Sequence, residues 1–225
     1  MWAELEPLRS ELSRDRDVAS AWVTLLQASP GRRGALDDVR TVLEAFADDA
    51  ELVVEGSIAL ARMAERDPDA PHLHAAALEL GDRATARALS SASDAPALLA
   101  ARGNLLRLGG PSRDAEAVAS LERAITREGR GEWLYDLGLC HKWAGRFRAA
   151  LLAFERAKEK LGATRGVLFN LAICATASGA AEEARDAWRA LGHDAKLEPG
   201  SLPFVEGLPP IQVRVPTRGS GPDSR

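Results

Sequence analysis

The sequence is poor in aromatic residues, which make up 5% of its 225 positions. Strands favour aromatic and β-branched residues, whereas alanine, leucine, glutamate and arginine, which dominate this chain, favour helices. With 46% hydrophobic and 28% charged residues, the composition is that of a globular protein, which excludes a fibre or a disordered chain. The length suits one large domain or two small ones. We therefore expect an all-α protein.

Cysteine, excess positive charge and long apolar runs are also scarce. Two cysteines cannot form a disulfide framework in a chain of this length. The 29 basic and 33 acidic residues leave a net charge of -4, and thus no overall positive field to hold nucleic acid. No run approaches the about 18 apolar residues of a membrane-spanning helix, and the first apolar run, residues 18–26, follows mixed charge rather than the positive start of a secretory signal. We expect a cytoplasmic protein that binds neither nucleic acid nor membranes.

The common motifs for catalysis and for phosphate or metal binding are missing as well. The glycines show neither the G-x-G-x-x-G nor the G-x-x-x-x-G-K-[ST] spacing, and no G-x-S-x-G occurs. His72 and His74 would point about 160° apart on a helix, so they do not make a metal pair. Adjacent Cys140 and His141 also diverge on a helix, and Cys140 fits core packing better than nucleophilic catalysis. We expect no enzymatic activity, no metal and no cofactor.

Proline and glycine divide most of the chain into short segments whose apolar residues recur at the three-to-four spacing of helices. The predicted helices cover roughly residues 3–28 with a break near Arg14, 35–47, 50–65, 70–80, 82–91, 96–108, 113–127, 131–144, 147–160, 166–178 and 181–191. One break therefore falls at Gly81. Prolines and glycines crowd residues 193–225, which predicts a non-helical tail whose apolar stretches, 202–205 and 211–215, suit an extended segment.

The C-terminal half contains an internal repeat, because a shift of 34 residues superposes residues of the same kind. The matched pairs are Leu134 with Leu168, Leu137 with Leu171, Cys140 with Cys174, Gly145 with Gly179, Ala150 with Ala184 and Phe154 with Trp188. The stretch 131–160 resembles the tetratricopeptide repeat, a helix hairpin with the pattern W-x2-L-G-x2-Y followed by A-x3-F. The residues at the pattern positions are Leu134, Leu137, Gly138, Ala150, Phe154 and Ala157.

The resemblance implies a right-handed α-solenoid of antiparallel helix hairpins. Three hairpins would cover about residues 96–192, with small residues at positions 138, 150, 172 and 184 where two helices approach closely. The predicted organisation is thus residues 1–94 as degenerate, repeat-like helices, residues 95–192 as three hairpins, and residues 193–225 as an extended tail.

In this family, certain positions of each first helix line a concave groove that binds peptides or helices. The resemblance places several residues of this chain there, Trp143 among them, with Tyr135, Leu139, Phe169 and Ile173 as an apolar floor. Arg107 and Lys142 flank this floor and suit an acidic or carboxyl group. The alternative is a register shifted by one residue, which would place Tyr135 and Phe169 in the ordinary core.

Taken together, these features predict a non-catalytic scaffold or adaptor that binds a protein or peptide partner in the groove of its repeats. The alternative function is that of an accessory or N-terminal regulatory module in a larger catalytic or regulatory assembly, which the strand-like stretch 211–215 would suit. The oligomeric state stays open. For the tail, three roles stay open: it caps the solenoid, occupies the groove or leads into a further domain.

Overall fold

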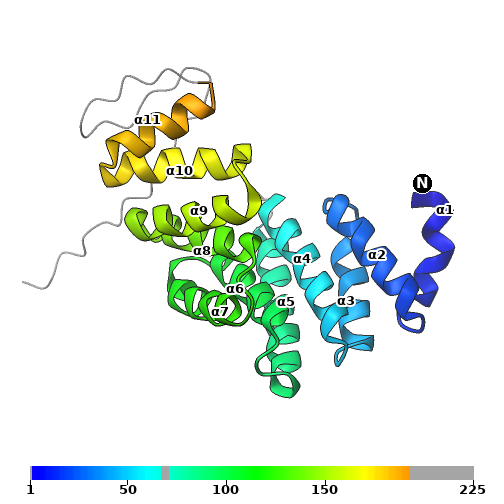
Figure 1. Ribbon diagram of the computed structural model, residues 1–225. Helices are drawn as coiled ribbons and strands as arrows, with labels where there is room; N and C mark the ends of the chain where they lie inside the picture. Colours follow the sequence, from blue (N-terminus) through cyan, green and yellow to red (C-terminus); the bar gives the residue numbers. More distant parts are fainter. Residues whose placement is uncertain (1, 67–70, 193–225) are drawn as a thin grey trace, which may run out of the picture. The chain divides into compact units, whose positions relative to one another are not determined.

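The computed structural model describes residues 2–66 and 71–192, and most of these residues are helical (Figure 1). The α-helices are α1 (Trp2–Leu5), α2 (Arg16–Ala28), α3 (Ala35–Ala45), α4 (Ala50–Arg66), α5 (Pro71–Ser91), α6 (Pro96–Leu108), α7 (Asp114–Arg127), α8 (Gly131–Trp143), α9 (Phe147–Leu161), α10 (Arg165–Ser178) and α11 (Ala181–Ala190). Two 3-10 helices, η1 (Glu6–Glu11) and η2 (Pro111–Arg113), complete them, and these ranges contain no strand. The predicted all-α fold is confirmed. The predicted tail, residues 193–225, lies outside the described residues.

The chain divides into two compact units, residues 1–129 and 130–225. The first unit contains α1 to α7, and the described part of the second contains α8 to α11. The boundary predicted between residues 94 and 95 falls inside the first unit, where α6 packs against both α4 and α5. The α6–α7 hairpin therefore shares a unit with the N-terminal helices, while the α8–α9 and α10–α11 hairpins belong to the second unit.

A buried carboxylate ties the first residues of the chain to α2 and α3. Asp38 is 2% exposed, and its Oδ1 accepts a hydrogen bond from Arg9 Nε at 2.6 Å. Its Oδ2 accepts from Arg32 Nη1 at 2.6 Å and from Trp22 Nε1 at 3.1 Å. The Arg32 guanidinium also lies 4.5 Å from the ring centroid of Trp2 and 5.2 Å from that of Trp22. The buried charge is thus fully paired, which is the condition for keeping it in a core.

Two predicted helix breaks have different outcomes. The break near Arg14 is confirmed, because η1 ends before it and the Asp15 side chain caps α2 by accepting two backbone N–H groups of its first turn. The break at Gly81 is wrong, because α5 runs through it without interruption. A Cβ on Gly81 would lie 2.6 Å from Leu105 Cδ1, so this glycine permits a close approach of α5 and α6 instead of ending a helix.

Small residues also lie where the two helices of a hairpin cross. A Cβ on Gly138 of α8 would lie 2.6 Å from Phe154 Cε1 of α9, and a Cβ on Gly103 of α6 would lie 2.7 Å from Leu121 Cγ of α7. The alanines that the repeat places at such approaches are all fully buried, namely Ala150, Ala172 and Ala184. Larger side chains at these positions would force the helices apart.

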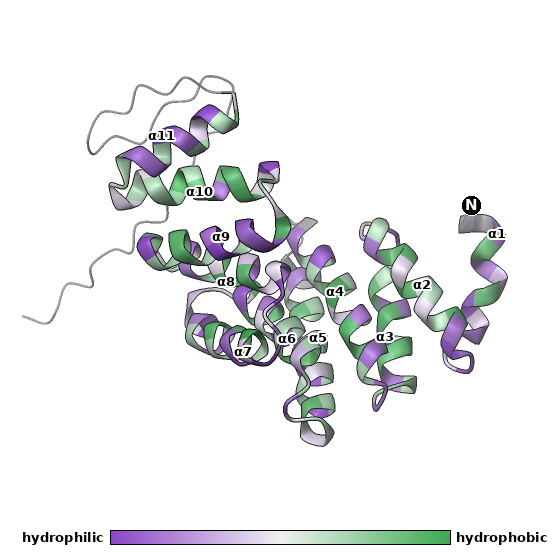
Figure 2. Ribbon diagram, viewed as in Figure 1, coloured by the Kyte–Doolittle hydropathy of each residue, from purple (hydrophilic) through white to green (hydrophobic). Residues whose placement is uncertain are grey.

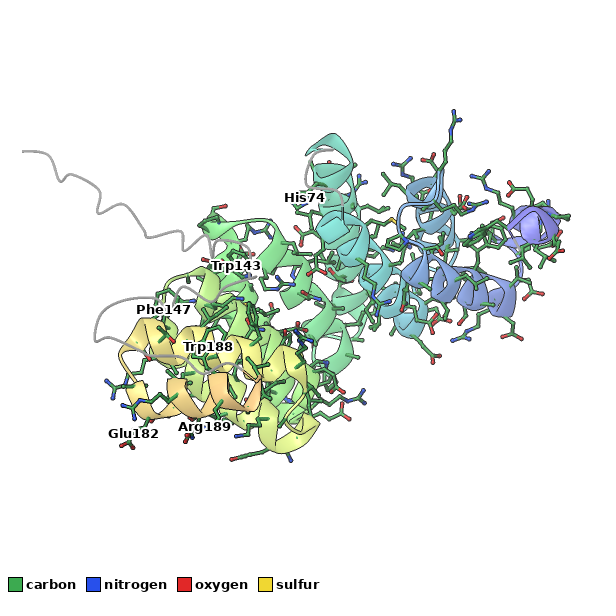
Figure 3. All side chains as sticks on the ribbon, turned by 90° about the horizontal axis from the view of Figure 1, so that it is seen from above. His74, Trp143, Phe147, Glu182, Trp188 and Arg189 are labelled. Carbon is green, nitrogen blue, oxygen red and sulfur yellow. The ribbon has the colours of Figure 1, made fainter. Side chains whose placement is uncertain are left out.

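The 34-residue repeat reappears in the aromatic packing of the second unit. Tyr135 of α8 packs edge-to-face on Phe154 of α9 with ring centroids 5.4 Å apart, and Phe169 of α10 packs in the same way on Trp188 of α11 at 6.1 Å. Each residue of the second pair follows its counterpart by 34 positions. Trp188 is buried between α11 and α10, whereas Glu182 and Arg189 are exposed on α11 (Figure 3). The α8–α9 and α10–α11 hairpins therefore have the same type of aromatic contact between their two helices.

Candidate functional site

Side chains of α8 and α10 meet around Asn170, a buried residue of α10. Its Nδ2 donates to Tyr135 Oη at 2.8 Å and to the Gly166 carbonyl at 2.9 Å, and its Oδ1 accepts from Lys142 Nζ at 2.6 Å. Burying an amide is favourable only when its polar atoms are bonded, as they are here. Two of the predicted site residues, Tyr135 and Lys142, are thus hydrogen-bonded to α10, the first helix of the next hairpin.

The predicted apolar residues lie at different depths on the same two helices. Leu139 and Phe169 are half-buried and pack against the core cluster that α9, α10 and α11 form. Ile173 belongs to that cluster and is 5% exposed. Tyr135, Leu139 and Phe169 therefore combine core contacts with some accessible surface. Ile173 has almost no accessible surface for a ligand to contact.

Arg107 lies on α6, in the first unit, and its guanidinium donates hydrogen bonds to side chains of the same unit. Its Nη2 lies 2.8 Å from Glu65 Oε1 and donates to Asn104 Oδ1 at 2.6 Å, and its Nε donates to the same Asn104 oxygen at 3.2 Å. The side chain is only 6% exposed. The predicted set is therefore divided between the two units, and the arginine expected to meet a ligand carboxyl group already pairs with Glu65.

Trp143, the last residue of α8, is 54% exposed (Figure 3). Lys142 Nζ lies 5.2 Å from the centroid of its ring. Tryptophan dominates binding energy at many protein interfaces, and a neighbouring cation adds an attraction to the ring face. The repeat pattern places Trp143 among the groove positions, although it was not among the residues predicted to form the apolar floor.

Asn170 was not predicted to be a site residue. The available signal was a single amide inside the apolar run 167–175, where a polar residue needs a partner from another helix. In the structure, its hydrogen-bond partners include Tyr135 and Lys142 of α8, two residues that the repeat pattern assigned to the groove.

The cysteines of the second unit are buried, and His141 is hydrogen-bonded. Cys140 and Cys174 form no disulfide and are buried. Burial raises the pKa of the Cys174 thiol to about 12, despite an opposing effect of Lys142. Arg146 Nε donates to His141 Nδ1 at 3.1 Å. Within residues 2–66 and 71–192, no group of three or more His, Cys, Asp or Glu side chains is arranged to hold a metal ion. None of the helices in these ranges has the length and hydrophobicity to cross a membrane.

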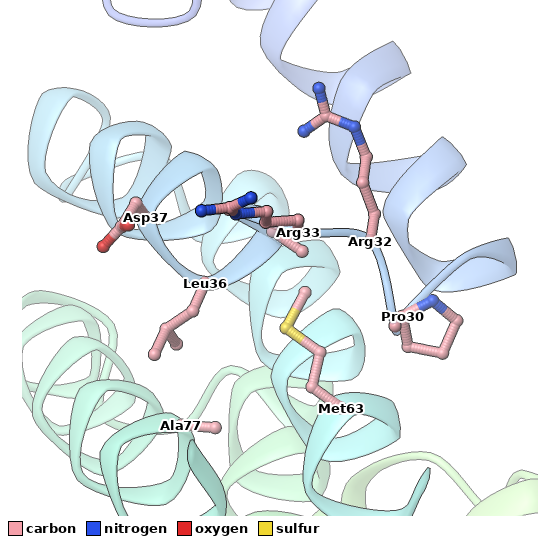
Figure 4. A pocket seen from close by; sticks show the side chains of 10 residues that line it. Pro30, Arg32, Arg33, Leu36, Asp37, Met63 and Ala77 are labelled. Carbon is pink, nitrogen blue, oxygen red and sulfur yellow. The ribbon is translucent and has the colours of Figure 1, made fainter. Parts of the chain in front are cut away.

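A pocket of about 470 Å³ lies in the first unit, between the α2–α3 loop, α4 and α5 (Figure 4). Leu36, Met63 and Ala77 supply apolar surface to it. Arg32 also lines it, but this guanidinium is already bonded to Asp38 and Glu6. Arg33 and Asp37 add charged side chains to its lining.

Comparison with known proteins supports the fold. No protein-family model matches the sequence, and no curated protein is significantly similar to it. Among solved structures, the crystal structure of the MamA protein superposes with a TM-score of 0.51 and 14% sequence identity, covering 75% of this chain and 88% of that chain. MamA contains tetratricopeptide repeats. The chain therefore has a tetratricopeptide-like helical fold, as the internal repeat predicts.

Proposed function

We propose that the chain is a non-catalytic scaffold that binds a cytoplasmic partner polypeptide on the α8–α10 surface, which we define as Tyr135, Leu139, Lys142, Trp143 and Phe169. The tetratricopeptide-like fold supports this proposal, since stacked helical repeats present extended surfaces that commonly bind proteins. Such surfaces are long and shallow, and they suit a polypeptide better than a small molecule, which needs a concave site.

The observation that carries the proposal is the exposure of Trp143 at the end of α8, the helix that also carries the partly buried Tyr135 and Leu139. An indole that is 54% exposed leaves a large apolar area in water, which a partner would remove. Tyr135 and Phe169 are each held by an edge-to-face contact within their own hairpin, so they present a preorganised surface. Binding there would cost little side-chain entropy.

Lys142 gives the surface a preference for acidic partners. Its ammonium group is positioned by Asn170 Oδ1 and by the Trp143 ring, on the same side of α8 as the proposed anchor. We propose that it attracts a carboxylate of the partner next to the indole. Charges of this kind affect the association rate and its salt dependence more than they affect the dissociation rate.

The proposal is tested by capturing partners from the cells of origin with the tagged chain, and then measuring the affinity of the captured polypeptide for variants. Trp143→Ala is expected to weaken binding by roughly tenfold or more, the loss typical of a central tryptophan. The matched control is Leu152→Ala on α9, whose side chain is 59% exposed and lies outside the α8–α10 surface. If both variants bind as tightly as the wild type, the partner uses another surface.

A further inference from the structure

The pocket of the first unit is a concave site that the proposed function does not use. Its volume of about 470 Å³ falls within the range of about 300 to 1,000 Å³ in which proteins bind small molecules. Leu36 of α3, Met63 of α4 and Ala77 of α5 form its apolar wall, and Figure 2 shows hydrophobic residues on all three helices. Leu36 and Met63 are only half-buried, so they leave apolar surface that a ligand would remove from water.

Three of the lining residues are charged, and two of these already have partners. The Arg32 guanidinium is bonded to two carboxylates of the first unit. Asp37 Oδ1 accepts a hydrogen bond from Arg40 Nη1 at 3.1 Å. The third residue, Arg33, is exposed, and its guanidinium forms no ion pair or hydrogen bond with another residue of the described part of the chain. One positive charge at the pocket is thus left for a ligand.

The combination of Arg33 with an apolar wall favours a ligand that carries one carboxylate on an apolar body. A guanidinium matches the two oxygens of a carboxylate with two parallel N–H groups. Arg33 lines the same pocket as Leu36 and Met63, so a ligand of this kind can use both types of surface at once (Figure 4). The negative charge of Asp37 in the same lining disfavours an anion of higher charge, such as phosphate.

We propose that this pocket binds a small monocarboxylate with an apolar body, such as a medium-chain fatty acid. Arg33 bonds its carboxylate, and its hydrocarbon chain lies against Leu36, Met63 and Ala77. All of these residues belong to the first unit, so the site depends neither on a partner polypeptide nor on the α8–α10 surface.

The test is isothermal titration calorimetry of the full-length chain with octanoate, and with 1-octanol as a neutral ligand of the same chain length. The expected result is saturable binding at one site, with octanoate bound more tightly than 1-octanol. Arg33→Gln should weaken octanoate binding by about three- to tenfold, the loss expected for a charged hydrogen bond at an exposed site, and leave 1-octanol binding unchanged. The matched control is Arg14→Gln, which removes the same charge from another exposed arginine of the first unit, outside the pocket lining.

A second variant tests the apolar wall. Met63→Gln places a polar group in the wall and should weaken the binding of both ligands. Inorganic phosphate, added in excess, should not displace octanoate.

Loss of octanoate affinity in Arg33→Gln but not in Arg14→Gln supports the proposal. The absence of saturable binding overturns it, as do equal effects of the two arginine variants and octanoate binding no tighter than that of 1-octanol. Displacement by phosphate would overturn the assigned class of ligand. None of these measurements involves a partner polypeptide, so failure here is distinguishable from failure of the proposed function.

Discussion

Gly138→Ala is expected to destabilise the second unit, although alanine is the better helix former. The added Cβ would lie 2.6 Å from Cε1, 2.7 Å from Cδ1 and 2.8 Å from Cζ of Phe154. The Phe154 ring is fully buried and is also packed against Tyr135, so it has little room to move away. Overpacking of this kind costs about 1 to 3 kcal/mol, and the higher helix propensity of alanine offsets about 1 kcal/mol. The expected net loss in the free energy of unfolding is about 0 to 2 kcal/mol.

Gly166→Ala in α10 is the matched control. A Cβ at Gly166 would contact only Tyr135 Oη, at the ordinary distance of 3.5 Å, so this variant should keep its stability or gain up to about 1 kcal/mol. Comparing the two variants largely cancels the propensity effect and leaves a difference of about 1 to 3 kcal/mol from overpacking. The assay is urea denaturation of the full chain followed by far-ultraviolet circular dichroism. A Gly138→Ala chain as stable as the Gly166→Ala chain would refute the close approach of α8 and α9.

Three further predictions concern the core. Ala150→Leu should cost about 1 to 3 kcal/mol of unfolding free energy, because Ala150 is fully buried where the repeat places the α8–α9 crossing. Ala149→Leu, at a partly exposed site, should leave the unfolding free energy nearly unchanged. Equal melting temperatures of the two variants would show that the repeat register is wrong. Asp38→Ala should cost about 3 kcal/mol by leaving the neighbouring guanidinium groups without their carboxylate, and an unchanged denaturation midpoint would contradict this. Burial raises the pKa of Cys174 to about 12, so this thiol and the buried Cys140 should resist a thiol reagent at about pH 8 in the folded chain. After denaturation without a reductant, both thiols should react.

Much of the fold was predictable because the signals are local. Proline and glycine mark most helix ends, and the 34-residue spacing predicted the equivalent packing of the two hairpins in the second unit. Gly81 shows where local signals fail. A glycine that ends a helix and one that admits a neighbouring helix look alike in sequence. The difference depends on a contact with Leu105, which is distant in the chain.

The candidate site was predictable in part for the same reason. Repeat positions placed Tyr135, Leu139 and Phe169 on the two adjoining first helices, and the structure brings them to one core cluster. Two features depend on long-range contacts and could not be predicted: the depth of Ile173, and the pairing of Arg107 with Glu65 on α4. Side-chain burial and ion pairs depend on which helices meet, and a repeat pattern specifies this only approximately.

The most direct measurement of the central claim is site-specific photo-crosslinking in the cells of origin. A photoreactive phenylalanine derivative would replace Trp143 in one chain and Leu152 in the other, two side chains that are similarly exposed, at 54% and 59%, on different helices. An interaction scaffold that uses the α8–α10 surface predicts a polypeptide covalently attached at position 143 and little or none at position 152. No product at position 143, or the same products at both positions, would contradict it.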